Sequence, residues 1–404
     1  MSSHRFHRTT LRRVAATALG VGALVLAPLA TALPASAMPS PATTGQHAVK
    51  PALPVYGWAS VSAGGRHSCG VRTNHTLWCW GYNYYGQLGD GTSAPRYKPQ
   101  QVGSGANWSS VSAGQYHTCG IRLDGSLWCW GYNAYGQLGL GDTASRYRPT
   151  RVGTADWSSI SAGGYHTCGV RSDGAIGCWG ENNSGQVGDG TSQNRYSPQR
   201  IGPEFDWVTI ATGDAHTCGI RANHTLRCWG DNGDGQLGTG DYADRYAPTF
   251  VGTARNWSNL GLGGQHTCGV RLDHTAYCWG YNGYGQVGDG TSTTRLYPTR
   301  VGTGRQWVSI DAGGYHTCAL KLDGTLWCWG YNTYGQLGDR TTVTHYIPER
   351  IGTSSLWETI STGSYHTCGY RQNNSVWCWG YNAYGQVGDG TTTNRLQPRM
   401  VQTV

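Results

Sequence analysis

The chain has 404 residues, including 63 glycines, 18 tryptophans and 25 tyrosines, but only 3 phenylalanines and 13% charged residues. An average soluble domain carries about 25% charged residues. This composition excludes a mainly helical protein, because Trp, Tyr, Thr, Val and Ile favour strands and Gly favours turns. We therefore expect an all-β fold.

The formal net charge of +8 overstates how basic the working protein is. Arg5, Arg8, Arg12 and Arg13 lie at the N-terminus, in a segment that we expect to be removed. The other basic residues recur singly along the chain, and no run of Lys and Arg resembles a nucleic-acid patch. We expect no nucleic-acid partner.

The N-terminus has the parts of an export signal. A basic stretch precedes an apolar stretch over residues 14–33, and an A-x-A motif ends at Ala37, before Met38. We expect residues 1–37 to be a signal peptide cleaved near Ala37-Met38, which predicts a secreted, extracellular protein. The general secretory route is favoured, with the twin-arginine route as the alternative. Residues 38–54 are predicted to be a flexible linker, and nothing later is long and apolar enough to span a bilayer.

Residues 55–404 are built from one repeated unit. Seven copies of about 50 residues begin near residues 58, 108, 157, 207, 257, 307 and 357. Each copy has four short apolar runs separated by Gly, Asp and Asn, with no helical period. This pattern predicts a seven-bladed β-propeller of four-stranded antiparallel blades.

The second copy contains W-G-Y-N-A-Y-G-Q-L-G from Trp130 to Gly139, with a G-x-x-H motif upstream. These motifs resemble the repeat of the regulator-of-chromosome-condensation family, and the resemblance covers all seven copies. It implies a seven-bladed propeller, and the family name implies guanine-nucleotide exchange, an alternative that fits an exported protein poorly. The superfamily also holds secreted bacterial propellers that inhibit β-lactamases. This chain resembles them in its export signal but not in its cysteines or its longer repeat.

Each copy contains one C-x9-C pair around a three-residue turn. Such a hairpin needs its last turn residue in the left-handed region, and Gly, His and Asn tolerate that conformation. The turn residues are His75, Gly125, Gly174, His224, His274, Gly324 and Asn374.

This register places the two cysteines of each copy directly opposite each other. A non-hydrogen-bonded antiparallel pair has Cα atoms about 4.5–5.5 Å apart, within reach of a disulfide, and export to an oxidising space favours the bond. The expected disulfides are Cys69-Cys79, Cys119-Cys129, Cys168-Cys178, Cys218-Cys228, Cys268-Cys278, Cys318-Cys328 and Cys368-Cys378.

Zinc is the alternative interpretation, because His-Thr-Cys or His-Ser-Cys recurs in every copy. One Cys pair and one His lack a fourth ligand and the usual close spacing, so we expect no metal and no cofactor. We interpret the recurring histidines as hydrogen-bonded scaffold residues: His67, His117, His166, His216, His266, His316 and His366. The Trp-Gly tryptophans should pack between blades.

No Ser-His-Asp set, paired catalytic carboxylate or G-x-S-x-G motif stands out, so we expect a binding protein and no enzyme. In a four-stranded blade the loops after the first and third strands leave at the same end, and tyrosines gather in both. We expect one face to carry a binding surface formed by Tyr82, Tyr84, Tyr85, Tyr116, Tyr132, Tyr135, Tyr165, Tyr281, Tyr284, Tyr315, Tyr331, Tyr334, Tyr365, Tyr381 and Tyr384.

The third and fourth copies interrupt this tyrosine pattern. They place Glu181, Asp214, Asp231 and Asp234 in the corresponding loops, and Gly177 and Arg227 replace the Trp before the second cysteine. A rigid Tyr-rich surface suits recognition of an extracellular protein, with inhibition as one outcome. A glycan or cell-wall ligand is the alternative, as is simple packing of the tyrosines against neighbouring loops. We expect a monomer.

Overall fold

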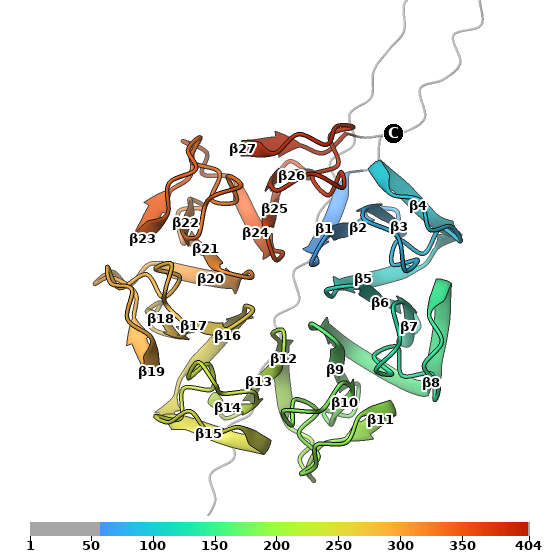
Figure 1. The fold of residues 1–404 in the computed structure, drawn as a ribbon, viewed down its shortest axis with the longest axis horizontal. Helices are drawn as coiled ribbons and strands as arrows, with labels where there is room; N and C mark the ends of the chain where they lie inside the picture. Colours follow the sequence, from blue (N-terminus) through green and yellow to red (C-terminus); the bar gives the residue numbers. More distant parts are fainter. Residues whose placement is uncertain (1–56, 403–404) are drawn as a thin grey trace, which may run out of the picture. The chain divides into compact units, whose positions relative to one another are not determined.

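The computed structural model describes residues 57–402, so the predicted signal peptide and linker lie outside the described residues. Seven blades surround a central channel (Figure 1). Five blades are separate four-stranded antiparallel sheets, and the second and third blades join into a seven-stranded sheet through the long strand β8. The predicted all-β, seven-bladed propeller is confirmed. The described part contains no helix of the length and apolarity needed to cross a membrane.

The first strand of each blade lines the channel, and the second follows it after a short Gly-containing turn. The first strands are β1 (Trp58–Ala63), β5 (Trp108–Ala113), the end of β8 (Arg146–Ala162), β12 (Trp207–Thr212), β16 (Trp257–Leu262), β20 (Trp307–Ala312) and β24 (Trp357–Thr362). The second strands are β2 (His67–Arg72), β6 (His117–Arg122), β9 (His166–Arg171), β13 (His216–Arg221), β17 (His266–Arg271), β21 (His316–Lys321) and β25 (His366–Arg371).

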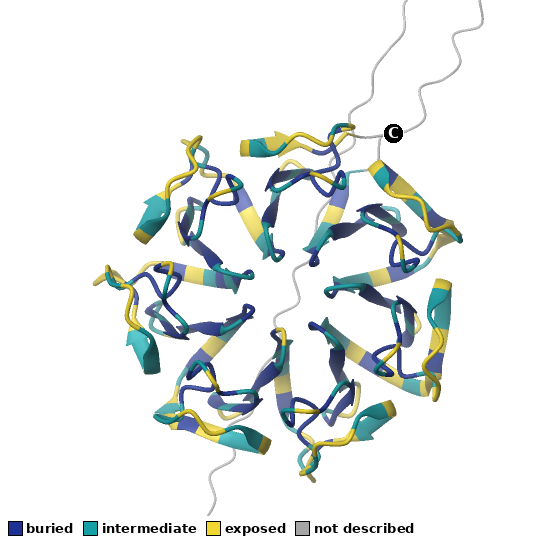
Figure 2. Ribbon diagram, in the orientation of Figure 1, coloured by how far each residue is buried: buried dark blue, intermediate teal, exposed yellow. Residues whose placement is uncertain are grey.

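The third strand carries the second cysteine, and the fourth forms the outer wall, where Figure 2 shows most of the exposed residues. The third strands are β3 (Thr76–Gly81), β7 (Ser126–Gly131), β10 (Ile176–Gly180), β14 (Thr225–Gly230), β18 (Ala276–Gly280), β22 (Leu326–Gly330) and β26 (Ser375–Gly380). The outer strands are β4 (Arg96–Ala106), the start of β8, β11 (Arg195–Arg200), β15 (Arg245–Arg255), β19 (Arg295–Arg300), β23 (His345–Arg350) and β27 (Arg395–Met400). Each outer strand contains a proline, such as Pro298, which removes a donor from the exposed edge and hinders pairing with another chain.

The ring closes without exchange of strands between its two ends. β27 pairs with β26 and β1 pairs with β2, so the last and first blades are each one continuous segment. Bonds between neighbouring blades hold the junction: the Trp58 amide donates to the Asn374 carbonyl at 2.9 Å, and the Gly390 amide donates to the Tyr97 carbonyl at 2.9 Å. How the ring closes could not be predicted from the sequence.

The predicted disulfide register is confirmed. In every blade the two cysteines are direct cross-strand partners, as Cys119 and Cys129 are, and each pair forms a disulfide. The Cα atoms are 4.1 Å apart, closer than the predicted range. The turn prediction also holds, because His75 has a φ of 62° and Gly125 a φ of 80°.

The hydrophobic core lies between the blades and is divided into seven clusters, one for each junction. In the cluster between the first two blades, the Cys69-Cys79 disulfide packs with Trp108 and Trp130. The Trp-Gly tryptophans are all fully buried, which confirms their predicted packing role: Trp80, Trp130, Trp179, Trp229, Trp279, Trp329 and Trp379.

Replacing Trp130 by Ala should destabilise the fold by about 3–5 kcal/mol, because a buried indole leaves a large cavity. The variant also loses the 2.9 Å hydrogen bond from the Trp130 indole to the Gln87 carbonyl. Trp128→Ala is the matched control. This half-buried ring stacks on Arg122, whose guanidinium carbon lies 3.7 Å from the ring centroid, and its removal should lower the free energy of unfolding by about 1–2 kcal/mol. Equal effects in chemical denaturation would contradict this account of the core.

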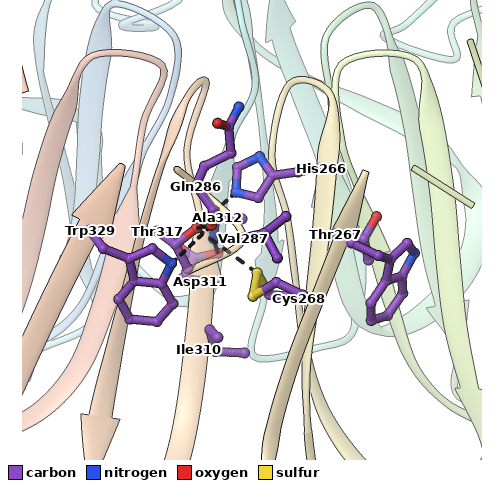
Figure 3. The surroundings of a disulfide bond; sticks show 12 residues. His266, Thr267, Cys268, Gln286, Val287, Ile310, Asp311, Ala312, Thr317 and Trp329 are labelled. Atoms are coloured by element: carbon purple, nitrogen blue, oxygen red, sulfur yellow. Dashed lines mark hydrogen bonds between the residues drawn. A yellow bond between two sulfur atoms is a disulfide. The ribbon is translucent and has the colours of Figure 1, made fainter. Parts of the chain in front are cut away.

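The recurring histidines join each blade to the next, as Figure 3 shows for His266. Its Nε2 lies 2.9 Å from the Thr317 hydroxyl, which donates its proton to the Gln286 carbonyl at 2.8 Å. The Trp329 indole donates to the same carbonyl at 2.9 Å. Because the hydroxyl proton is already used, His266 must donate from Nε2.

This contact is repeated around the complete ring, with Ser68 taking the hydroxyl role at the last junction. Burial lowers the pKa of each of these histidines to about 3, so they stay neutral. Their predicted scaffold role is confirmed: Nε2 is engaged in a hydrogen bond, and the neighbouring sulfurs are in disulfides.

Candidate binding face

The loops that carry the tyrosines are held rigid by the Asn and Gln of the repeated motif. In the first blade, the buried Asn83 accepts from the Leu88 amide at 2.9 Å and donates to the carbonyls of Thr92 and Ala94, each at 3.0 Å. The buried Gln87 side chain accepts from the Tyr85 amide at 3.1 Å. The same Asn-to-amide bond recurs in every blade. These residues therefore fix the loop backbone, which presents the first and fourth positions of each loop.

The tyrosines form one continuous surface, which we call the tyrosine arc; it consists of the fifteen tyrosines named above. Where both loops carry them, the fourth-position ring of one blade contacts the first-position ring of the next. The ring centroids are 4.7 Å apart for Tyr85–Tyr132, 4.8 Å for Tyr384–Tyr82, 4.9 Å for Tyr284–Tyr331 and 4.9 Å for Tyr334–Tyr381. Tyrosines of the shorter loops fill the inner side, as Tyr165 does at 5.2 Å from Tyr135.

The arc tyrosines pack against one another but are not buried. Tyr84 is 62% exposed and Tyr284 is 38% exposed, and the others are intermediate. Among the described residues, the one hydrogen bond to an arc hydroxyl comes from Arg66 to Tyr384, at 3.3 Å. Burial and the neighbouring phenols raise the pKa of Tyr165 to about 12, so its hydroxyl remains protonated. The arc thus presents rigid ring surfaces and free hydroxyl groups. Its tyrosines pack against one another and are still partly exposed.

An acidic gap separates the two ends of the arc, at Tyr165 and Tyr281. Its members are Glu181, Asp231, Asp234 and Asp244, in the third-strand loops of the third and fourth blades. Desolvation raises the pKa of Glu181, and desolvation together with Asp231 raises the pKa of Asp234. No ion pair involves these four carboxylates within residues 57–402.

The central channel opens at the centre of this face. Gly64, Asp214 and their counterparts line it. Solvent reaches the Asp214 carboxylate, but the protein surrounds it closely, and this desolvation raises its pKa. Asp214 also lies near the tyrosine arc. The pKa values of Tyr315 and Tyr365 are raised mainly by their own desolvation, and the charge of Asp214 raises them further.

A second channel residue, Asp311, replaces a serine that most blades use to join neighbouring first strands. Ser62 accepts from the Ala113 amide at 3.0 Å. Asp311 instead accepts from the Thr362 amide at 2.8 Å and from its neighbour Ala312 at 3.0 Å. Burial raises its pKa from 3.8 to about 6 despite these hydrogen bonds.

Asp311→Ser should therefore remove one pH-dependent cost. A raised folded-state pKa means that the unfolded chain ionises first, so Asp311 destabilises the fold increasingly from about pH 4 to pH 6, and fully above it. The free energy of unfolding of the variant minus that of wild type should be about 1–3 kcal/mol larger at pH 7.5 than at pH 4. Thermal unfolding of both proteins at the two pH values measures this difference. A constant difference would contradict the assignment.

Three residues of this face were not predicted from the sequence. Arg66 lies over Tyr384, with its guanidinium carbon 5.4 Å from the ring centroid, and bridges the last and first blades. Asp244 joins the acidic gap from the far end of its loop, and Asp311 lies in the channel. Each of the three differs from its counterparts in the other copies, as Asp311 differs from Ser62. A position-by-position comparison of the seven copies would therefore have singled them out.

Comparison with known families agrees with this fold, which defines a disulfide-linked, seven-bladed propeller. The RCC1-like domain matches residues 43–269. One family model of the regulator of chromosome condensation (RCC1) repeat matches residues 257–286, 307–336 and 357–386. A second model of the same repeat matches residues 273–320, 323–370 and 373–404. The chain belongs to the RCC1-like family. No relative was found among curated proteins.

Solved structures share the fold at low sequence identity. Human WBSCR16 is 21% identical with a TM-score of 0.74, covering 81% of this chain and 94% of its own. Prp20p from Saccharomyces cerevisiae is 20% identical with a TM-score of 0.74, covering 82% and 87%. The ectodomain of the Physcomitrella patens receptor kinase CR4 is 22% identical with a TM-score of 0.52, covering 80% and 73%.

Proposed function

We propose that this chain is an exported, non-enzymatic propeller that binds an extracellular protein through the tyrosine arc and the adjoining acidic gap. The observation that carries the proposal is the arc itself: fifteen neighbouring tyrosines, partly exposed, on loops fixed by buried Asn and Gln side chains. Rigid tyrosines provide large contact areas at a small entropic cost. Nothing in the fold itself requires them in the third-strand loops, since the third and fourth blades form with Glu181 and Asp231 at the first position of those loops.

The relatives support protein binding as a use of this fold. The yeast protein RCC1 (Prp20) has been crystallised bound to Kap60, and the same protein has been described with binding properties to Gsp1p and histones. The CR4 structure is a receptor ectodomain, so a related propeller is part of an extracellular region. Inhibition of a partner enzyme is one outcome of such binding.

The test is capture of partners from culture supernatant by the mature protein and by Tyr82→Ala/Tyr132→Ala/Tyr331→Ala. We expect the variant to lose the captured proteins. The matched control is Tyr147→Ala/Tyr196→Ala/Tyr297→Ala, which removes three exposed tyrosines from the outer strands and should retain them. Identical captures by wild type and the arc variant would end the proposal, and binding of purified wall glycans lost only in the arc variant would favour the glycan alternative.

Export is a separate part of the proposal. Residues 1–37 should be absent from the protein in the medium, which would begin at or near Met38. Intact mass measurement of the secreted protein tests this point. Retention of the complete chain inside the cell would contradict export and with it the extracellular partner.

A further inference from the structure

We propose that the outer wall of the propeller carries a set of cationic, tryptophan-lined grooves that bind an anionic polysaccharide. Three such grooves lie between neighbouring blades: between the second and third, the fifth and sixth, and the sixth and seventh. They are separate from the tyrosine arc, and the inference does not depend on the function proposed for it.

The groove between the fifth and sixth blades is the most complete. It has a volume of about 560 Å³, within the range of small-ligand sites. Trp307 and Trp327 form its aromatic wall, and Lys321 lies between them, 5.0 Å and 3.5 Å from the two ring centroids. Arg300, from the preceding blade, also lines the groove and is exposed.

The next groove repeats part of this arrangement one blade further along, because Trp357 lines it and Trp377 does not. It has a volume of about 600 Å³ and contains Trp357, Arg371 and Arg350 at the corresponding positions. Arg371 lies 4.2 Å from the ring centroids of both Trp357 and Trp377. Arg340 adds another exposed charge.

The third groove, between the second and third blades, is a natural variation. It has a volume of about 470 Å³ and contains Trp157, Arg171 and Arg200, with Gly177 in the place of Trp327. Without the second indole, the Arg171 side chain is 40% exposed and approaches Asp173 at 3.8 Å. The groove between the fifth and sixth blades is therefore the better site for a test.

In the two grooves between the fifth and sixth and the sixth and seventh blades, Arg300, Lys321, Arg350 and Arg371 form no ion pair within the described part of the chain. Desolvation lowers the pKa of Lys321, an effect that the Asp323 carboxylate opposes and Arg350 adds to, and desolvation lowers the pKa of Arg371. The stacked cations thus have no carboxylate in an ion pair with them, and a bound carboxylate or phosphate would form one.

The arrangement favours a polymer of sugars over other anions. In the groove between the fifth and sixth blades, the partly exposed Trp327 offers a ring surface to the apolar face of a sugar, while Trp307 beneath it is 4% exposed. The neighbouring cations can pair with the acidic group of that sugar. Neighbouring grooves recur at successive blade junctions, so one repeating chain can occupy two of them and gain from multivalency. A nucleic acid shares the charge and the stacking, and the test distinguishes it.

The experiment measures binding of the exported protein to polygalacturonate and to poly(glycerol phosphate), with dextran as the neutral control and single-stranded oligothymidine as the nucleic acid. We expect polygalacturonate to bind, dextran not to bind, and poly(glycerol phosphate), which carries negative charge without a sugar ring, to bind more weakly than polygalacturonate. Arg300→Ala/Arg350→Ala should weaken that binding about tenfold or more. The matched control, Arg255→Ala/Arg399→Ala, removes two exposed arginines that do not line these grooves and should change it less than about twofold.

Three results would overturn the inference: no binding of polygalacturonate, equal losses in the two double variants, or tighter binding of oligothymidine or poly(glycerol phosphate) than of polygalacturonate. Trp327→Gly copies the natural Gly177 and should also weaken binding, while circular dichroism checks that it folds. Tyr82→Ala/Tyr132→Ala/Tyr331→Ala should bind the polymer like wild type, which separates this site from the tyrosine arc.

Discussion

Lowering the pH from 7 to 5 should remove on the order of 10 kcal/mol of folding free energy, enough to unfold the propeller. The cause is the ring of seven buried histidines, whose pKa values lie at about 3 in the fold and at 6.5 in the unfolded chain. As the pH falls below 6.5, the unfolded chain takes up protons and the folded chain does not. Stability is therefore fully present above about pH 6.5 and is lost progressively toward pH 3.

Each histidine contributes about 2 kcal/mol over this interval, from the difference in proton binding between the two states. Asp311 opposes the change, but it is a single group of smaller effect. Denaturation curves at several pH values give the dependence, and its slope near pH 5 should approach the uptake of about seven protons on unfolding. A stability that stays constant between pH 7 and pH 5 would show that the ring accepts protons in the fold.

Reduction of all seven disulfides should prevent the mature chain from refolding. Each bond joins cysteines ten residues apart, and closing such a loop stabilises the fold by about 2.5–3 kcal/mol in the chain-entropy model. Together the seven exceed the stability of about 5–15 kcal/mol that is typical of a folded protein. Circular dichroism of chain unfolded with reductant, and then diluted, reports the result.

The contribution of one blade is tested by Cys119→Ala/Cys129→Ala. This variant should lose about 3 kcal/mol and remain folded, because six other disulfides persist. Chain unfolded without reductant and then diluted is the control for the first experiment and should regain its native spectrum. Refolding of the fully reduced chain to wild-type stability would contradict this account of the disulfides.

The sequence was sufficient for the features that depend on local spacing. The distance from Cys119 to Cys129, with Gly125 at the turn, determined both the hairpin register and the disulfide. The strict recurrence of the Trp-Gly step determined the number of blades. The position of the tyrosines in two loops at the same end predicted that they would share a face.

Contacts between repeats could not be derived in this way. The spacing does not reveal that His67 reaches Thr118 of the next blade, because neither residue is close to the other along the chain. The role of Asp311 depends on the narrow channel, which forms only when the ring closes. The outer grooves combine Arg300 with Trp327, residues of different repeats whose separation depends on how two blades pack.

The claim that the tyrosine arc is the binding face is tested most directly by photo-crosslinking. A photoreactive residue at Ala134 or Ala383, both exposed between arc tyrosines, would be compared with the same residue at Leu123 or Leu322, exposed in turns at the opposite end of the blades. Illumination of the mature protein in culture supernatant should link proteins to the first pair of positions and not to the second. Adducts formed only from Leu123 and Leu322 would place the partner on the other face and contradict the proposal.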